Sequence, residues 1–177
     1  VRGIRVSLDK EEIFMTQLRA ILRASLYGNL SVMFPMISSV AEVQRAKLLL
    51  GRAGKELKAE KIPYNEKIEV GVMIETPAAV MISGELTREV DFVSIGTNDL
   101  TQFTLGMDRG NERLEPYYDP HHPALLKMIR IVANNVHLEN KRISICGDLA
   151  ADPEMTEFFL QIGIDELSVA PGEVLSL

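Results

Sequence analysis

The chain has 177 residues, of which 46% are apolar and 25% are charged, and its net charge of −6 argues against nucleic-acid binding, which requires a basic surface. This size suits a single domain with a substantial core, and no apolar run reaches the ~20 residues of a membrane-spanning helix, so we expect no membrane contact. The only cysteine, Cys146, excludes an internal disulfide and is typical of a cytoplasmic protein.

Along the chain, short continuous runs of apolar residues, typical of buried strands, alternate with segments whose apolar residues recur at helical spacing. Residues 2–8 are mixed in character, and Asp9 with Glu12 fits a capping box for a helix that ends near Gly28. Short apolar runs predict strands at residues 30–36, 68–74, 91–95, 142–146 and 166–170. Helical patterns predict helices at residues 38–50, 77–82, 97–106, 123–136 and 153–163.

Residues with capping or helix-breaking character mark the ends of these helices. The predicted N-caps are Ser38 or Ser39, Thr76, Thr97 or Asn98, and Asp152. Gly51 and Gly54 leave open how far the helix that starts near residue 38 continues. The polar stretch between Arg109 and Pro120 is long enough to be an active-site loop.

The repeated strand–helix pattern predicts an α/β fold with a parallel sheet, either a (β/α)8 TIM-type barrel or a doubly wound open sheet. No glycine-rich dinucleotide fingerprint follows a strand, whereas polar residues follow several strands, as on the catalytic rim of a barrel. We therefore favour a barrel of which about five of the eight βα units are visible. Residues 1–177 are interpreted as one domain, the later part of a barrel truncated on its N-terminal side.

Several of the polar residues at strand ends are candidates for binding an anion and a metal ion. Glu75 and Asp99 end two strands and are hard-oxygen ligands suited to one Mg²⁺ ion, although each also suits the cap of a following helix. Arg2 and Arg109 suit a phosphate or carboxylate group, unless they are ordinary surface arginines. Asn98 is either a phosphate ligand or a helix cap.

Cys146 ends a strand, where a thiol is either an inert apolar group or, protonated at neutral pH, a proton donor. The pair His121 and His122 precedes Pro123 and fits a loop and capping element, with no zinc-type spacing of His and Cys around it.

Longer motifs carry a resemblance to a known family. Residues 74–79 (IETPAA), 94–102 (SIGTNDLTQ), 108–111 (DRGN) and 146–150 (CGDLA) resemble the phosphoenolpyruvate-utilising enzymes. Within that family the chain is most similar to the C-terminal domain of the Enzyme I phosphoenolpyruvate–protein phosphotransferases of the bacterial sugar phosphotransferase system, and residues 18–25 and 33–37 also match.

The resemblance implies roles for individual residues. Glu75 and Asp99 would bind Mg²⁺, while Asn98 and Arg109, assisted by Arg2, would bind the phosphate of phosphoenolpyruvate. Cys146 would protonate C3 of the enolate that remains after phosphoryl transfer, which gives pyruvate. The family also implies a homodimer, and a histidine phosphocarrier protein that docks on a domain outside this chain.

Two departures limit what the chain is expected to do alone. Asp148 stands where the family has glutamate, and the upstream barrel strands and the phospho-accepting histidine are not in this sequence. We therefore expect no complete autophosphorylation by the chain itself, and at most weak binding of phosphoenolpyruvate. The alternatives are a non-catalytic dimerisation or metabolite-sensing module, and part of a pyruvate phosphate dikinase or phosphoenolpyruvate synthase; a binding module would not need the proton donor Cys146.

Overall fold

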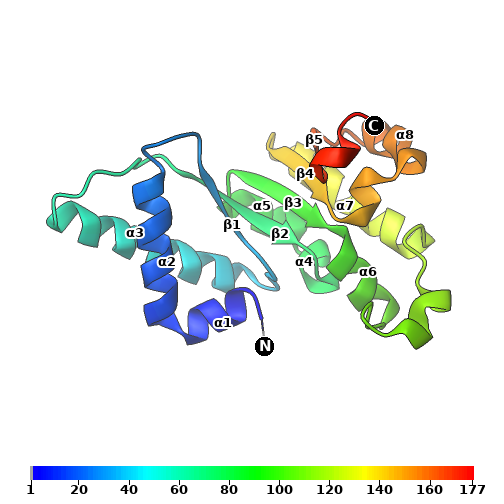
Figure 1. Cartoon of the computed structure of the whole chain (residues 1–177), viewed down its shortest axis with the longest axis horizontal. Coiled ribbons are helices and arrows are strands. Elements are labelled where there is room, and N and C mark those ends of the chain that lie inside the picture. The colour runs from blue at the N-terminus through cyan, green and yellow to red at the C-terminus, as the bar shows by residue number, and fades with distance from the viewer. Residues whose placement is uncertain (1) are drawn as a thin grey trace.

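The computed structural model describes residues 2–177 and contains one sheet with helices beside it (Figure 1). The strands are β1 (Ser31–Phe34), β2 (Glu69–Ile74), β3 (Phe92–Gly96), β4 (Arg142–Cys146) and β5 (Glu166–Ser168). The α-helices are α1 (Ile4–Asp9), α2 (Glu11–Ala24), α3 (Val40–Ala59), α4 (Pro77–Met81), α5 (Ser83–Glu89), α6 (Thr97–Leu105), α7 (Pro123–Leu138) and α8 (Pro153–Gln161). Short 3-10 helices are η1 (Glu112–Tyr117), η2 (Asp148–Ala151) and η3 (Pro171–Glu173).

The strand order decides between the two predicted architectures. All strands are parallel and lie in the order β1-β2-β3-β4-β5, so each strand pairs with its neighbours in the sequence. A doubly wound sheet would reverse this order at a switch point, whereas a βα barrel keeps it. The predicted α/β barrel, incomplete with these five strands, is confirmed.

The two faces of the sheet differ in composition. One face is covered by a continuous helical layer, in which α2 packs on α3, α3 on α5, and α5 on α7. The strand residues on that face are large, apolar and buried: Val32, Phe34, Val70, Val72, Ile74, Val93, Ile95, Ile143 and Ile145. The opposite face alternates with them and is mixed: it carries the small or polar residues Gly71, Ser94, Ser144 and Cys146, together with the larger Met33, Met73 and Phe92. In a closed barrel this second face points inward.

Several predicted helix ends are confirmed by hydrogen bonds. Ser39 and Glu42 form a capping box at the start of α3, Thr76 caps α4 ahead of Pro77, and Asp152 caps α8. Helix α6 ends at Gly106, whose φ of 64° is left-handed. Over the described range 2–177, no helix has both the length and the apolar character needed to cross a membrane.

Other boundaries differ from the sequence prediction. The capping box at Asp9 is wrong: Asp9 is the last residue of α1, and Lys10 precedes α2 without a side-chain cap. Gly3, whose φ is 60°, directly precedes α1, and Ile4, the first residue of α1, is completely buried. Neither Thr97 nor Asn98 caps α6, since both lie within the helix. Helix α5 was not predicted.

Helix α3 is continuous through both of its glycines and extends to Ala59, beyond the predicted end. Gly54 lets the ring of Tyr64 pack closely on the helix, because a Cβ atom at this position would lie 2.7 Å from the Tyr64 hydroxyl. The glycine that weakens the helical pattern in the sequence therefore serves the packing of the loop that follows α3.

Candidate active site

The predicted site residues lie at the carboxyl ends of neighbouring strands. Glu75 follows the last residue of β2, Asp99 lies in the first turn of α6 just after β3, and Cys146 ends β4 opposite Gly96 in the strand register. Because parallel strands present their carboxyl ends at one edge, these side chains come from three consecutive strands to one place. The predicted placement of Glu75 and Asp99 at the ends of two strands is confirmed.

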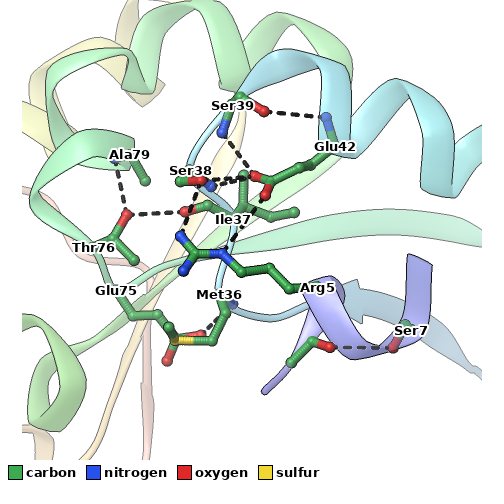
Figure 2. A network of polar contacts seen from close by, with 11 residues as sticks. Arg5, Ser7, Met36, Ile37, Ser38, Ser39, Glu42, Glu75, Thr76 and Ala79 are labelled. Atoms are coloured by element: carbon green, nitrogen blue, oxygen red, sulfur yellow. Dashed lines mark hydrogen bonds and ion pairs between the residues drawn. The ribbon is translucent and has the colours of Figure 1, made fainter. Parts of the chain in front are cut away.

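Glu75 is buried, with an exposed fraction of 4%. Its Oε1 accepts a hydrogen bond of 2.5 Å from the backbone N–H of Met36, and its Oε2 lies above Gly96, where a Cβ atom would come within 3.0 Å of it (Figure 2). Burial raises the pKa of Glu75 to about 7; the Met36 hydrogen bond opposes this rise, and the negative charge of Asp99 adds to it. A buried carboxyl in this state gains from a nearby cation.

Asp99 supplies the second carboxylate, with a side-chain exposure of 15%. The guanidinium of Arg2 forms an ion pair with its Oδ1. Even so, within residues 2–177 Oδ1 is the buried side-chain oxygen that accepts no hydrogen bond of suitable geometry. This oxygen is therefore buried, and its charged partner among the described residues is Arg2. Two acidic side chains at one strand edge, one of them buried with a raised pKa, fit a divalent cation.

Asn98 lies between the carboxylates and the loop after β4. Its side-chain carbonyl accepts a hydrogen bond of 2.8 Å from the backbone N–H of Asp148. This approach depends on Gly147, which has a φ of 95° and where a Cβ atom would come within 2.6 Å of the Asn98 oxygen. The carbonyl end of Asn98 is thereby used by the protein, which leaves its NH₂ group as a donor for a ligand.

Arg109 lies at a distance from the carboxylates in the described structure: no ion pair or hydrogen bond joins its side chain to Glu75 or Asp99 among residues 2–177. It is exposed and lines a cleft of about 380 Å³ together with Asp148 and Tyr118. Tyr118 and Asp148 also line a smaller cavity of about 130 Å³ beside Asn98. Two shared residues therefore connect the cleft of Arg109 with the cavity beside Asn98.

Cys146 is half-buried, and Sγ accepts a hydrogen bond of 3.9 Å from the hydroxyl of Ser94. Its backbone carbonyl accepts a hydrogen bond of 2.8 Å from Thr97. Burial raises the pKa of the thiol; the Ser94 bond opposes this rise, and the charges of Glu75 and Asp99 add to it. The thiol is therefore protonated at neutral pH, as a proton donor must be.

A second group of metal-ligating side chains was missed by the sequence analysis. His121 Nε2 lies 2.6 Å from Asp152 Oδ2, and these two residues and Glu154 offer ligand atoms within 4.8 Å of one another. The pairing joins residues 31 positions apart, which no local motif reveals. Both oxygens of Asp152 already have partners, since Oδ1 accepts from the N–H of Glu154 at 2.9 Å. This group lacks the unsatisfied oxygen that Asp99 has.

The remaining histidines have structural contacts. His122 Nδ1 accepts a hydrogen bond of 3.2 Å from the N–H of Ala124 and so caps α7, as the capping interpretation predicted. His137 Nε2 lies 2.9 Å from the carbonyl oxygen of Gly163, in the turn before β5.

Comparison with known proteins gives close relatives over nearly the whole chain. A family model described as PEP-utilising enzyme, PEP-binding domain, matches residues 1–177. The phosphoenolpyruvate-protein phosphotransferase of Haemophilus influenzae is 48% identical over 169 residues, which are 96% of this chain and 29% of that relative. Proteins of the same name from Buchnera aphidicola subsp. Baizongia pistaciae and Priestia megaterium are 47% and 44% identical, each over 98% of this chain and 30% of the relative. The chain thus spans about 30% of the length of these relatives.

Solved structures support the fold. A citrate lyase from Burkholderia xenovorans LB400 superposes with a TM-score of 0.69 at 18% identity, over 92% of this chain and 51% of that one. A pyruvate kinase from Cryptosporidium parvum gives 0.62 at 15% identity, over 88% and 30%. At such identities the likeness concerns the fold alone, a TIM-type barrel of which this chain forms part. From the family match and the close relatives together, the chain belongs to the PEP-binding domain family of the PEP-utilising enzymes.

Proposed function

We propose that this chain is the phosphoenolpyruvate- and Mg²⁺-binding part of a phosphoenolpyruvate–protein phosphotransferase. The observation that carries the proposal is the meeting of Glu75 and Asp99 at one strand edge, where the buried Glu75 has a raised pKa and Asp99 is paired with Arg2. The phosphotransferase names of the relatives support the reaction class.

Glu75 and Asp99 are the residues that would hold the ion. Two carboxylates are the usual protein contribution to a Mg²⁺ site, with water or substrate oxygens completing the octahedron. When bound, the ion supplies positive charge for the phosphate and for the enolate oxygen. Arg2, already paired with Asp99, supplies a second positive group at the same place.

The chain's own donors would position the substrate phosphate. Arg2 and Arg109 offer bidentate guanidinium groups, and Asn98 offers the NH₂ group that its bond to Asp148 leaves over. Phosphoryl transfer depends mainly on positioning and on charge around the transferred group. Arg109 lines the open cleft of about 380 Å³, so we expect it to reach the phosphate from the loop after α6.

Cys146 would provide the proton that the reaction needs after transfer. When the phosphoryl group leaves, the substrate remains as an enolate; its C3 takes the proton of the thiol and gives pyruvate and a thiolate. The raised pKa of Cys146 keeps the proton on sulfur until then, and the Ser94 hydroxyl donates to the sulfur that carries the resulting charge.

The acceptor histidine and the docking region for the histidine phosphocarrier protein would lie in the parts of the enzyme that this chain does not span. Sugar uptake, a homodimer and a cytoplasmic location belong to the same proposal. The support for sugar uptake and a homodimer is the sequence resemblance to the Enzyme I phosphotransferases, and the support for the location is the free thiol of Cys146.

Calorimetric titration of the chain with phosphoenolpyruvate, with and without Mg²⁺, tests the proposal. We expect binding that requires Mg²⁺ and is lost in Glu75→Ala. His137→Ala is the matched control, since His137 contacts the turn before β5 and not the site. Binding that is equal with and without Mg²⁺, or unchanged in Glu75→Ala, would contradict the proposed site.

A further inference from the structure

The two oxygens of Glu75 have different surroundings. Oε1 accepts the 2.5 Å hydrogen bond from the backbone N–H of Met36. Oε2 lies close to Gly96, where a Cβ atom would come within 3.0 Å of it, and accepts no backbone hydrogen bond among the described residues. Gly96 lies three residues before Asp99, the second carboxylate of the proposed cation site. Glu75 is therefore left with one oxygen, Oε2, for a cation.

The Met36 N–H points at Glu75 because of an unusual backbone conformation. Met36 has a φ of 58°, in the left-handed region that residues other than glycine rarely adopt and that is retained where surrounding structure imposes it. Its buried side chain packs against Gly3, where a Cβ atom would lie 2.7 Å away, and the N–H of Ile4 donates to the carbonyl of Pro35 at 3.2 Å. The start of α1 thus holds the turn around Met36.

A second hydrogen bond fixes the same two segments in the opposite direction. The hydroxyl of Thr76 donates to the carbonyl of Ile37 at 2.9 Å, one residue along from the Met36–Glu75 bond in both segments (Figure 2). The Thr76 hydroxyl also accepts from the N–H of Ala79 at 3.1 Å. Residues 36–37 and 75–76 are therefore joined by a reciprocal pair of bonds.

The far side of the loop is anchored to α3 and α1. Glu42 Oε2 accepts from the N–H groups of Ser38 and Ser39 at 2.7 and 2.9 Å. Arg5 lies between the Ser38 hydroxyl, at 3.4 Å, and Glu42 Oε1, at 3.9 Å. Figure 2 shows the contacts of Arg5, Ser38 and Glu42 next to the separate bond between Met36 and Glu75; the backbone of residues 36–38 connects the two groups. The loop between β1 and α3 is thus held on both sides.

We infer that Met36 and Thr76 are positioning residues that make Glu75 a one-oxygen ligand, and that this gives the site a preference for Mg²⁺ over Ca²⁺. Mg²⁺ requires near-ideal octahedral geometry at about 2.0–2.1 Å, whereas Ca²⁺ takes more oxygens and often binds both oxygens of a carboxylate. With Oε1 engaged by Met36, two-oxygen binding of Ca²⁺ costs the Met36 hydrogen bond. This inference rests on the proposed cation site.

The test measures displacement of Mn²⁺ from the chain by Mg²⁺ and by Ca²⁺, followed by the electron paramagnetic resonance signal of free Mn²⁺, without phosphoenolpyruvate. Thr76→Val removes the hydroxyl that joins the two segments, and Thr76→Ser keeps it. We expect the Mg²⁺-to-Ca²⁺ affinity ratio to fall about tenfold in Thr76→Val, the size of effect typical of residues that orient metal ligands. In Thr76→Ser the ratio should stay within about twofold of the original.

Ser39→Ala is the control for the loss of a helix cap near the same loop, because Ser39 caps α3 without touching Glu75. The Mg²⁺-to-Ca²⁺ affinity ratio of this variant should be unchanged. Met36→Ala is a second variant: it removes the side chain that packs against Gly3 and keeps a residue for which a φ of 58° is unfavourable, so it should also lower the ratio. An unchanged ratio in both Thr76→Val and Met36→Ala, or equal affinities for the two ions in the original chain, would overturn the inference. The cation test contains no phosphoenolpyruvate, so its result is independent of substrate binding. A failure of phosphoenolpyruvate binding in the calorimetric titration would overturn the proposed function and not this inference.

Discussion

Two groups of side chains in this chain could take a cation, and they differ in whether their oxygens are already used. In one, Glu75 is buried with a raised pKa, and Asp99 Oδ1 accepts no hydrogen bond among the described residues. In the other, Asp152 contacts His121 through one oxygen and caps α8 through the other. The ligand chemistry is similar in both. What separates them is that Asp99 Oδ1 has an ion pair with Arg2 but no hydrogen bond, whereas both oxygens of Asp152 have hydrogen-bond partners.

The strongest way to break this comparison is to neutralise one aspartate in each group. Asp99→Asn should weaken Mn²⁺ binding more than about 100-fold, since even residues that only orient metal ligands cost about 10–100-fold. Asp152→Asn keeps the cap of α8 and should change binding less than about twofold. Free-Mn²⁺ titration measures both, and a larger loss in Asp152→Asn would reverse the assignment.

The second prediction concerns how the free energy of unfolding depends on pH, since a carboxyl with a raised pKa, Glu75, belongs to the first group. The pKa of Glu75 is about 7 in the folded chain against an ordinary 4.5, so between these values the folded chain binds more protons than the unfolded one. The free energy of unfolding therefore falls as the pH rises from about 4.5 to about 7, by at most about 3 kcal/mol. Below pH 4.5, where Glu75 is protonated in both the folded and the unfolded chain, none of this free energy of unfolding is lost.

Glu75→Gln should remove this fall, because the amide oxygen still accepts from Met36 and carries no charge. Urea unfolding at pH 5 and pH 8 measures it: the variant should gain stability relative to the original chain at pH 8 only, and saturating Mg²⁺ should reduce the gain. A parallel pH dependence in the two proteins would show that Glu75 is not the group responsible.

The smallest expected effect concerns the complete group. Asp152→Ala should lower the free energy of unfolding by about 1 kcal/mol through loss of the α8 cap, and Asp152→Asn by only a few tenths. Thermal unfolding should show a shift of about 2–4 °C for the alanine variant. If instead added Zn²⁺ or Mn²⁺ stabilised the original chain but not Asp152→Ala, the second group would be a cation site after all.

Sequence patterns predicted the features that depend on neighbouring residues. The strands follow from short apolar runs, and the caps at Ser39 and Thr76 follow from the residues just after them. Glu75 and Asp99 could be placed at one edge because a parallel sheet brings its carboxyl ends together. These predictions needed only local chemistry and the periodicity of strands and helices.

Features that depend on distant partners could not be predicted in this way. Three such contacts join segments that are 31 to 50 positions apart: the bond from the left-handed Met36 to Glu75, the bond from Asp148 to Asn98, and the contact of His121 with Asp152. The start of α1 was missed because its stability comes from burying Ile4 beneath the loop after β1, not from a capping motif.

The bond between Asn98 and the loop after Gly147 has a mechanical consequence. Asn98 and Asp99 are adjacent on α6, and Thr97 on the same turn holds the carbonyl of Cys146. A displacement of this turn would therefore carry Asn98, Asp99 and the backbone of Cys146 together. The loop containing Arg109 is joined to the same helix, because the backbone N–H of Arg109 donates to the side-chain oxygen of Gln102 on α6 at 3.1 Å. We therefore expect a movement of α6 to shift the proposed site residues Asn98, Asp99 and Arg109 in the same direction.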